Sequence, residues 1–331
     1  MRRHFLNAAL ILLFTTVAAR ALEPATRPAG IAGEPEATQT IEPAQFMRFA
    51  QDVRGARLET AAVTYRNDAG QAVRLVGAIH IGEKAYFEAL NKDFENEDAV
   101  LYELVKPKDT ALPRPGAAAP AGDNPISQMQ HFMKDTLNLQ FQLDMIDYTK
   151  PNFVHADLDK ETFEKMQAER GESFEMLMMK QLMKAMTEPD PQKEEDAKQP
   201  SQDEMVDDLI KLLTRPDMER QVKLLVARQL TDMELKGMGL SNDSVIVGER
   251  NKAAMKVLAD TLAQGKKKIS IFYGAAHMPD LSARLRAMGF KPAACEWKTA
   301  WDLTIRNDQP SAVETLLREA IKAISDDDGQ N

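Results

Sequence analysis

Cysteine, excess basic charge and long apolar runs are scarce in this chain, and each absence excludes a class of protein. The only cysteine among 331 residues is Cys295, so no intramolecular disulfide can form and core packing alone must stabilise the fold. We expect this cysteine to be a small buried side chain in a strand. Asp and Glu outnumber Lys and Arg by 51 to 42, for a formal net charge of −9, which argues against nucleic acid as a partner. No apolar run beyond residue 21 is long enough for a transmembrane helix, so we expect no stable membrane insertion.

The amino-terminal residues have the pattern of a cleaved export signal. Two arginines precede an apolar stretch over residues 8–19, and an Ala-x-Ala motif ends at Ala21. We therefore expect residues 1–21 to be removed and the protein to be periplasmic or secreted. The arginine pair also fits the twin-arginine (Tat) route, but the strong apolar stretch favours general secretion (Sec). Residues 22–44, rich in Pro, Ala, Thr and Glu, predict a flexible lead-in.

Histidine is scarce too, yet two of the five histidines stand at equivalent places in a repeat. Residues 77–80 read Gly-Ala-Ile-His, and residues 274–277 read Gly-Ala-Ala-His. In each copy an apolar run of strand character precedes the motif, and an amphipathic helical stretch follows it. A second apolar run then ends in a carboxylate, Glu103 in one copy and Glu296 in the other. Ligands bind at the carboxyl ends of the strands in open α/β sheets, so we expect the two histidines to lie together.

Glycine, proline and polar turn residues divide the chain into predicted helices and strands. Their order predicts an α/β fold with a mixed central sheet built from the two repeats and interrupted by a large helical insertion. Residues 45–105 form the first half of the core, 106–238 the insertion with mobile linkers, and 239–331 the second half with a carboxyl-terminal helix. The shorter patterns predict helices at 46–53, 84–94, 252–263 and 281–288, a hairpin turn at 67–70, and strands at 99–105, 152–154 and 244–247.

Two imidazoles and a carboxylate are a donor set that Mn²⁺, Co²⁺ or Zn²⁺ accepts. We predict His80, His277 and Glu103 as metal ligands, with coordination positions left open for a water and a substrate carbonyl. Glu103 lies on an apolar strand, where an unpaired carboxylate is unfavourable, and this favours a catalytic or ion-paired role. Gly77 and Gly274 allow the backbone to approach a bound cofactor closely.

Further polar residues are candidates for the same site. Arg250 is predicted to be catalytic and to bind substrate through a carboxylate or a developing oxyanion, and Asn251 to orient the ligand. Glu296 is a candidate general base by repeat symmetry, and Glu249 is either functional or an ion-pair partner at a helix start. His155 and Asp157 are further candidates, although helix capping by Asp157 or Asp159 is the favoured interpretation.

The order of these motifs resembles the TraB/PrgY/GumN family, which includes the Tiki proteases. The resemblance rests on residues 77–80, 102–103, 249–251 and 274–279, and covers about 73–297 outside the insertion. It implies an α/β fold with paired Gly-x-x-His motifs and, for Tiki members, divalent-metal-dependent peptidase activity. Related folds include a haem-binding lipoprotein and an esterase-like group. This chain departs from the pattern at Asp280, where glycine is common.

Two functions follow from these patterns. The first is a metal-dependent hydrolase, peptidase-like, acting on a peptide or small-molecule substrate. The alternative is a non-catalytic extracytoplasmic protein that binds haem or metal in the same cleft. The carboxylate and arginine that accompany the histidines favour the hydrolase, because a haem pocket requires a broad apolar surface as well as axial ligands.

Overall fold

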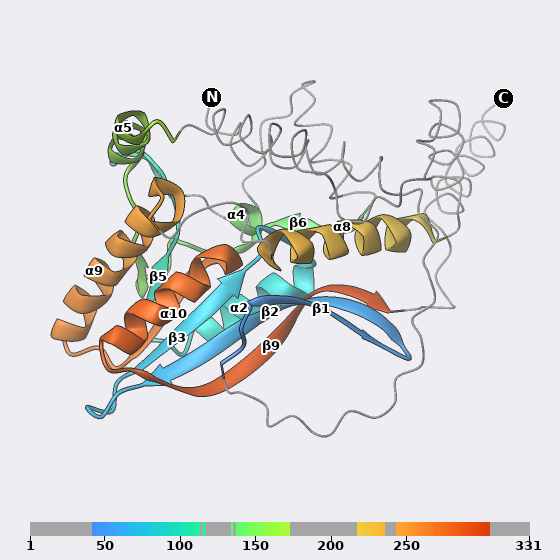
Figure 1. Cartoon of the computed structure of the whole chain (residues 1–331), viewed down its shortest axis with the longest axis horizontal. Coiled ribbons are helices and arrows are strands. Elements are labelled where there is room, and N and C mark those ends of the chain that lie inside the picture. Colours follow the sequence, from blue (N-terminus) through green and yellow to red (C-terminus); the bar gives the residue numbers. More distant parts are fainter. Residues whose placement is uncertain are drawn as a thin grey trace, which may run out of the picture.

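A mixed β-sheet forms the centre of the molecule (Figure 1). The computed structural model describes residues 42–112, 115–116, 134, 137–172, 217–235 and 243–304. The expected export signal, the apolar stripes over 174–213 and the expected carboxyl-terminal helix lie outside these residues. Within them, the main sheet has seven strands: β1 (Met47–Asp52), β2 (Gly55–Arg66), β3 (Ala72–Ala78), β5 (Ala99–Tyr102), β7 (Phe153–His155), β8 (Lys268–Gly274) and β9 (Lys291–Thr304).

The antiparallel half of the sheet is organised by the long strand β2. Strand β9 pairs with one edge of β2 over its whole length. On the other edge, β1 pairs with the first half of β2 and β3 with the second half. The turn between β2 and β3 is closed by Asn67 and Gly70, and Gly70 adopts a positive φ of 76°, which few residues other than glycine tolerate. The predicted hairpin is therefore confirmed.

The parallel half of the sheet runs β3-β8-β5-β7, so β8 lies between β3 and β5. Strand β5 is buried at every residue, and β8 at every residue after its first, as expected for strands covered on both faces. Because these four strands are parallel, their carboxyl ends meet at one edge of the sheet.

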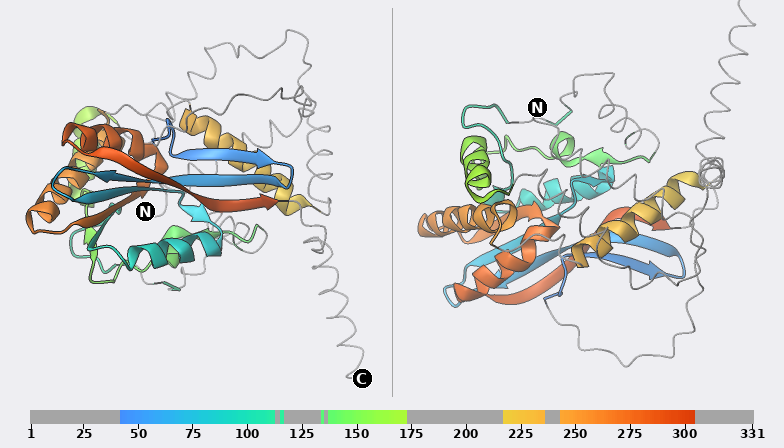
Figure 2. Two further views of the ribbon diagram at one scale, coloured as in Figure 1. Left: turned by 90° about the horizontal axis from the view of Figure 1, so that it is seen from below. Right: turned by 45° about the horizontal axis from the view of Figure 1, so that its top comes forward.

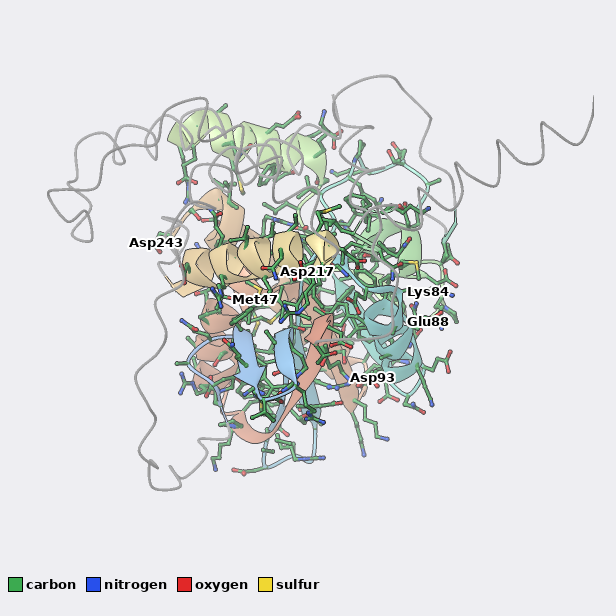
Figure 3. All side chains as sticks on the ribbon, turned by 90° about the vertical axis from the view of Figure 1, so that its right-hand side faces the viewer. Met47, Lys84, Glu88, Asp93, Asp217 and Asp243 are labelled. Atoms are coloured by element: carbon green, nitrogen blue, oxygen red, sulfur yellow. The ribbon has the colours of Figure 1, made fainter. Side chains whose placement is uncertain are left out.

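Helices cover both faces of the sheet. Helix α2 (Lys84–Phe94) covers one face and buries Tyr86, Phe87, Leu90 and Phe94. Helices α8 (Met218–Leu235) and α10 (Met278–Ala287) cover the other face, as Figure 2 shows. In Figure 3 the labels of Lys84, Glu88 and Asp93 mark α2 on its own side of the strands.

Three further α-helices and a small second sheet lie among the described residues. Helix α5 (Lys160–Arg170) is capped by Asp159, which accepts a hydrogen bond from the backbone of Thr162, so the predicted cap is confirmed at Asp159. Helix α9 (Arg250–Ala263) packs beside β5 and α10. The short α4 (Gln142–Met145) follows β6 (Gln140–Phe141), which pairs with β4 (Ile81–Gly82). None of the described helices is both long enough and apolar enough to span a bilayer.

Several local predictions are wrong. The segment predicted as a helix over 46–53 contains strand β1 (Met47–Asp52), because pairing with β2 overrides a weak helical pattern. Residues 244–247 lie in a one-turn π-helix, η3 (Val245–Glu249), capped by Ser244. The insertion is not purely helical, since it contributes the predicted strand at 152–154 to the main sheet as β7. Cys295 is half-buried, on β9.

The two repeats end differently. After α2 the chain returns to the parallel half of the sheet as β5, on the far side of β8 from β3. After α10 it crosses to the opposite end of the sheet and pairs antiparallel with β2 as β9. The shared features are therefore the strand, the Gly-x-x-His turn and the helix, and the second strands are not equivalent.

Candidate functional site

The two Gly-x-x-His motifs leave adjacent strands at the same level. Strands β3 and β8 pair in register, with Ala78 opposite Gly274. His80 follows β3, and His277 lies in the 3-10 turn η4 (Ala275–His277) that follows β8. A Cβ built on Gly274 would lie 3.4 Å from His80 Nε2 and 3.8 Å from His277 Cδ2. The structure thus brings both histidines together around Gly274.

Glu103 lies between these motifs, directly after β5. Its Oε2 accepts the backbone N–H of Gly274 at 2.6 Å, and its Oε1 accepts from Arg250 Nη2 at 2.7 Å. Burial alone would raise the pKa of Glu103, but the Arg250 guanidinium, the two imidazoles and the Gly274 N–H together outweigh it and hold this pKa well below its usual range. Glu103 is therefore ionised across the physiological pH range.

Arg250 is held in position by two buried carboxylates. Its Nε donates to Asp157 Oδ1 at 2.9 Å, and its Nη2 donates both to Asp157 Oδ2 at 2.6 Å and to Glu103 Oε1. The Asp157 side chain has no exposed surface, and that of Arg250 is 10% exposed. Burial lowers the pKa of Arg250, but Asp157 and Glu103 outweigh this and raise the pKa above its ordinary value. The two acids and one base form a buried network at the ends of β5 and β7.

The tautomer of His277 is fixed by Asn251. Asn251 Nδ2 donates to Asp280 Oδ2 at 2.8 Å and to the His277 carbonyl at 3.2 Å, and both of these groups are only acceptors. Its Oδ1 therefore faces His277 Nδ1, at 2.7 Å, and accepts a hydrogen from it. Because Nδ1 carries the hydrogen in the neutral ring, Nε2 carries a lone pair. Burial lowers the pKa of His277 to about 4, so the ring is neutral at pH 7.

His80 is oriented in the same way by the insertion. Its Nδ1 lies 3.1 Å from Gln142 Oε1, while Gln142 Nε2 donates to the hydroxyl of Tyr148 at 2.9 Å. The backbone also links them, since Gln142 N–H donates to the His80 carbonyl at 2.9 Å. With the hydrogen on Nδ1, Nε2 of His80 also carries a lone pair, on the side of Gly274 and Glu103.

Two hydrogen-bond acceptors consequently face each other in a buried place. His277 Nε2 lies 3.7 Å from Glu103 Oε1, and with His277 neutral no hydrogen lies between them. Glu103 Oε1 already accepts from Arg250 Nη2, whereas none of the described residues donates to His277 Nε2, so this lone pair is open to a cation or a donor. In metalloproteins, an imidazole that binds metal through one nitrogen almost always donates its other N–H to a fixed acceptor, and both histidines here meet that condition.

Several predicted site residues lie elsewhere or have other contacts. Glu296 is exposed on β9 and pairs with Arg74 at 2.6 Å and Lys298 at 2.8 Å. Glu249 pairs with Arg170 and Lys252 at the start of α9. Gly77 packs against β2, where an added Cβ would lie 3.2 Å from the Ala61 carbonyl oxygen. These contacts are structural.

His155 lies next to the network without joining it. Its Nε2 donates to the Leu104 carbonyl at 2.7 Å, and its ring packs edge-on against Tyr102. Together with Asp157 it lines a cavity of about 240 Å³ beside the network.

Sequence reasoning missed Gln142, Tyr148 and the role of Asp280. Asp280 stands three residues after His277, and this proximity to the second motif was the only sequence signal for it, because its contact with Asn251 joins residues 29 positions apart. Gln142 carries no local signal, because its position depends on the pairing of β6 with β4.

Comparison with known proteins adds no assignment: no family model, no curated protein and no solved structure matches the chain. Within the described residues, no three His, Cys, Asp or Glu side chains are already grouped as a metal site. In the geometry described above, both Glu103 oxygens accept hydrogen bonds, from Gly274 and Arg250.

Proposed function

We propose that the chain is an extracytoplasmic hydrolase of the TraB/PrgY/GumN type that uses a divalent metal ion, Mn²⁺, Co²⁺ or Zn²⁺, to cleave a peptide or another amide or ester. The observation that carries this proposal is the pair of facing acceptors, His277 Nε2 and Glu103 Oε1, 3.7 Å apart. A cation between them would be bound by the His277 Nε2 lone pair and by the Glu103 carboxylate, to which Arg250 Nη2 already donates. His80 Nε2, beside Gly274, supplies a second imidazole donor.

The residues present fit such an ion through their donor chemistry. Two imidazoles present Nε2, and an ionised carboxylate compensates charge. A bound divalent ion would polarise a carbonyl and lower the pKa of a water molecule. The low pKa of Glu103 makes it a weak proton acceptor, so its chemistry supports a ligand or electrostatic role rather than that of a general base.

Arg250 and Asn251 have separate tasks in this proposal. Arg250 keeps Glu103 ionised and in place, and its Nη1 is the guanidinium nitrogen for which the described residues supply no acceptor. That nitrogen supports contact with a substrate oxygen that becomes negative during hydrolysis. Asn251 is fully buried and holds His277, so it acts as a positioning residue rather than a substrate contact.

The test is metal quantification of the purified protein together with hydrolysis of a mixed peptide and ester panel. His80→Ala, His277→Ala and Glu103→Gln should each remove most of the bound metal and the activity, and double variants should be little worse than single ones. Glu88→Gln, on the exposed side of α2, is the matched control for Glu103→Gln and should change neither.

Two results would redirect the assignment. Metal or haem bound without any hydrolysis would replace the enzyme with the extracytoplasmic binding protein that uses the same donors. If the wild-type protein contains no divalent ion and cannot be distinguished from His80→Ala in any assay, both the hydrolase and the binding-protein assignments are wrong.

A further inference from the structure

A cavity beside the buried network has the chemistry of an anion site. It has a volume of about 240 Å³ and is lined by Lys106, Lys108, His155, Asp157 and Asp159. These residues follow β5 and β7, so the cavity lies at the same sheet edge as Glu103. In a chain with a net charge of −9, two lysines that line one cavity at this edge are a local exception.

The two acids of the cavity are already neutralised. Both oxygens of Asp157 accept from Arg250. Asp159 accepts the N–H and the hydroxyl of Thr162 as the cap of α5, with Lys108 Nζ 3.6 Å away. Neither carboxylate is therefore free to balance Lys106.

Lys106 is the unbalanced charge. Its Nζ donates to the carbonyl oxygens of Pro107 at 3.4 Å and Lys108 at 3.2 Å, and no carboxylate among the described residues pairs with it. An ammonium has three donors, so one N–H remains. The backbone beneath it is fixed, because the Lys106 carbonyl accepts from Lys160 N–H at 2.9 Å. An ammonium with a free donor at a cavity wall has the chemistry to bind an anion.

Asp157, which lines the cavity, is linked to the proposed reaction centre through Arg250. Arg250 Nη2 donates to Asp157, which lines the cavity, and to Glu103, which faces both histidines. The two carboxylates thus lie on either side of a single nitrogen. Their oxygens lie 2.6 and 2.7 Å from that nitrogen, and an extended peptide advances about 3.5 Å per residue, so the Asp157 wall of the cavity is within about two residues of Glu103.

We propose that this cavity binds a carboxylate of the substrate through Lys106, assisted by Lys108, and so selects peptides with a negative charge one or two residues beyond the scissile bond. This inference rests on the proposed hydrolase and names its substrate class. The carboxylate is that of a chain end or of an acidic side chain, and the experiment separates these sources.

The test is calorimetric binding of three blocked peptides: N-acetyl-Ala-Ala-Ala with a free carboxylate, its carboxyl-terminal amide, and the amide of N-acetyl-Ala-Glu-Ala. Measurements use wild type and, so that turnover does not consume the peptide, His80→Ala. At least one peptide with a carboxylate should bind about tenfold more tightly than the neutral amide. Which of the two does so identifies the source of the charge.

Lys106→Gln should abolish the preference, and Lys108→Gln should reduce it. The matched control is Lys256→Gln, an exposed lysine on α9 that pairs with Asp260 and should retain the full preference. Equal binding of all three peptides to wild type, or an unchanged preference in Lys106→Gln, overturns the assignment.

The outcomes also distinguish this inference from the proposed function. A preference that depends on Lys106, in a protein that hydrolyses nothing, supports the cavity and removes the hydrolase. Hydrolysis of acidic and neutral peptides with equal kcat/KM, unchanged in Lys106→Gln, supports the hydrolase and overturns the role of the cavity.

Discussion

Asn251 Oδ1 accepts a hydrogen bond from His277 Nδ1 at 2.7 Å, and this one contact decides which ring nitrogen faces Glu103. Asn251 is buried within α9, while His277 follows β8, so the tautomer depends on the packing of that helix against the sheet. The relationship can be tested without any assumption about substrate.

Asn251→Leu should release the His277 tautomer. Nitrogen-15 NMR of the ring should show the hydrogen on Nδ1 in wild type and a mixture of tautomers in the variant. Metal affinity, if the proposed function holds, should fall about 10- to 100-fold. Asn152→Leu is the control, since Asn152 also donates to two carbonyls but lies at the amino-terminal end of β7. An unaltered ring spectrum in Asn251→Leu would show that Asn251 does not fix the tautomer.

Arg250→Met should destabilise the fold, because it leaves Glu103 and Asp157 buried without their counter-charge. Removal of one partner from a buried ion pair costs about 3–5 kcal/mol. Urea unfolding of Arg250→Met should show a loss of this size. Lys256→Met, on the same helix but in an exposed pair with Asp260, should change stability by less than about 1 kcal/mol. Equal losses in the two variants would contradict the buried network.

Two glycines of the repeat should respond differently to alanine. At Gly274, a Cβ makes ordinary 3.4 Å contacts with Glu103 Oε2 and His80 Nε2, so the fold should tolerate it while the methyl group obstructs the space between those donors. At Gly77, a Cβ meets the Ala61 carbonyl oxygen at 3.2 Å, and the backbone of β2 must shift. Gly274→Ala should lower ligand binding and activity at nearly unchanged Tm, and Gly77→Ala should lower Tm by several degrees. The reverse pattern in paired melting and activity assays would contradict this geometry.

Asp98→Asn should remove a pH-dependent contribution to stability at the start of β8. Backbone N–H groups of Lys267 and Lys268 donate to Asp98 Oδ2 at 2.8 and 3.0 Å, and they lower the pKa of this carboxyl group. A lowered folded-state pKa gives stability that is present above the unfolded pKa of about 3.9 and is lost as pH falls through the folded value. The variant should therefore be less stable than wild type at pH 7, and the difference should shrink below about pH 4.

The control for that series is Asp68→Asn, since the Asp68 side chain is 96% exposed. It should show no comparable difference at any pH. A constant difference between Asp98→Asn and wild type from pH 7 to pH 3 would mean that the carboxylate charge is not the source of the stability.

The sequence predicts those elements that are defined by the spacing of neighbouring apolar residues or by turn residues. Helix α2 has its predicted bounds because Tyr86, Phe87, Leu90 and Phe94 already define one apolar face. The β2–β3 hairpin follows from its turn residues in the same way. Strand β1 was misassigned as a helix, since its pattern is ambiguous and only the partner strand β2 settles it.

The site residues that belong to a local sequence motif could be predicted. Those that reach the site only through pairing of strands far apart in the sequence could not. His80 and His277 were identified because two Gly-x-x-His turns at the carboxyl ends of strands are expected to meet at one sheet edge. Glu103 was identified at the end of the apolar run that closes the first repeat, and Arg250 and Asn251 in the Glu-Arg-Asn triplet at a predicted helix start. Glu296 was placed by repeat symmetry, which does not extend to β9. Gln142 reaches His80 only because β6 pairs with β4, and two-residue strands leave almost no pattern in a sequence.

The position of β8 between β3 and β5 has a consequence for the order in which the molecule forms. During synthesis β3 and β5 emerge early, each with an open edge, and the strand that fills the gap follows only after the entire insertion. Such long-range pairing is slow, and open edges invite pairing with other chains. Asn251 emerges shortly before that late strand, and His277 directly after it. A chain cut short before β8 therefore loses its central strand together with His277 and the Gly274 N–H that binds Glu103, so synthesis of this late strand completes both the sheet and the arrangement around Glu103.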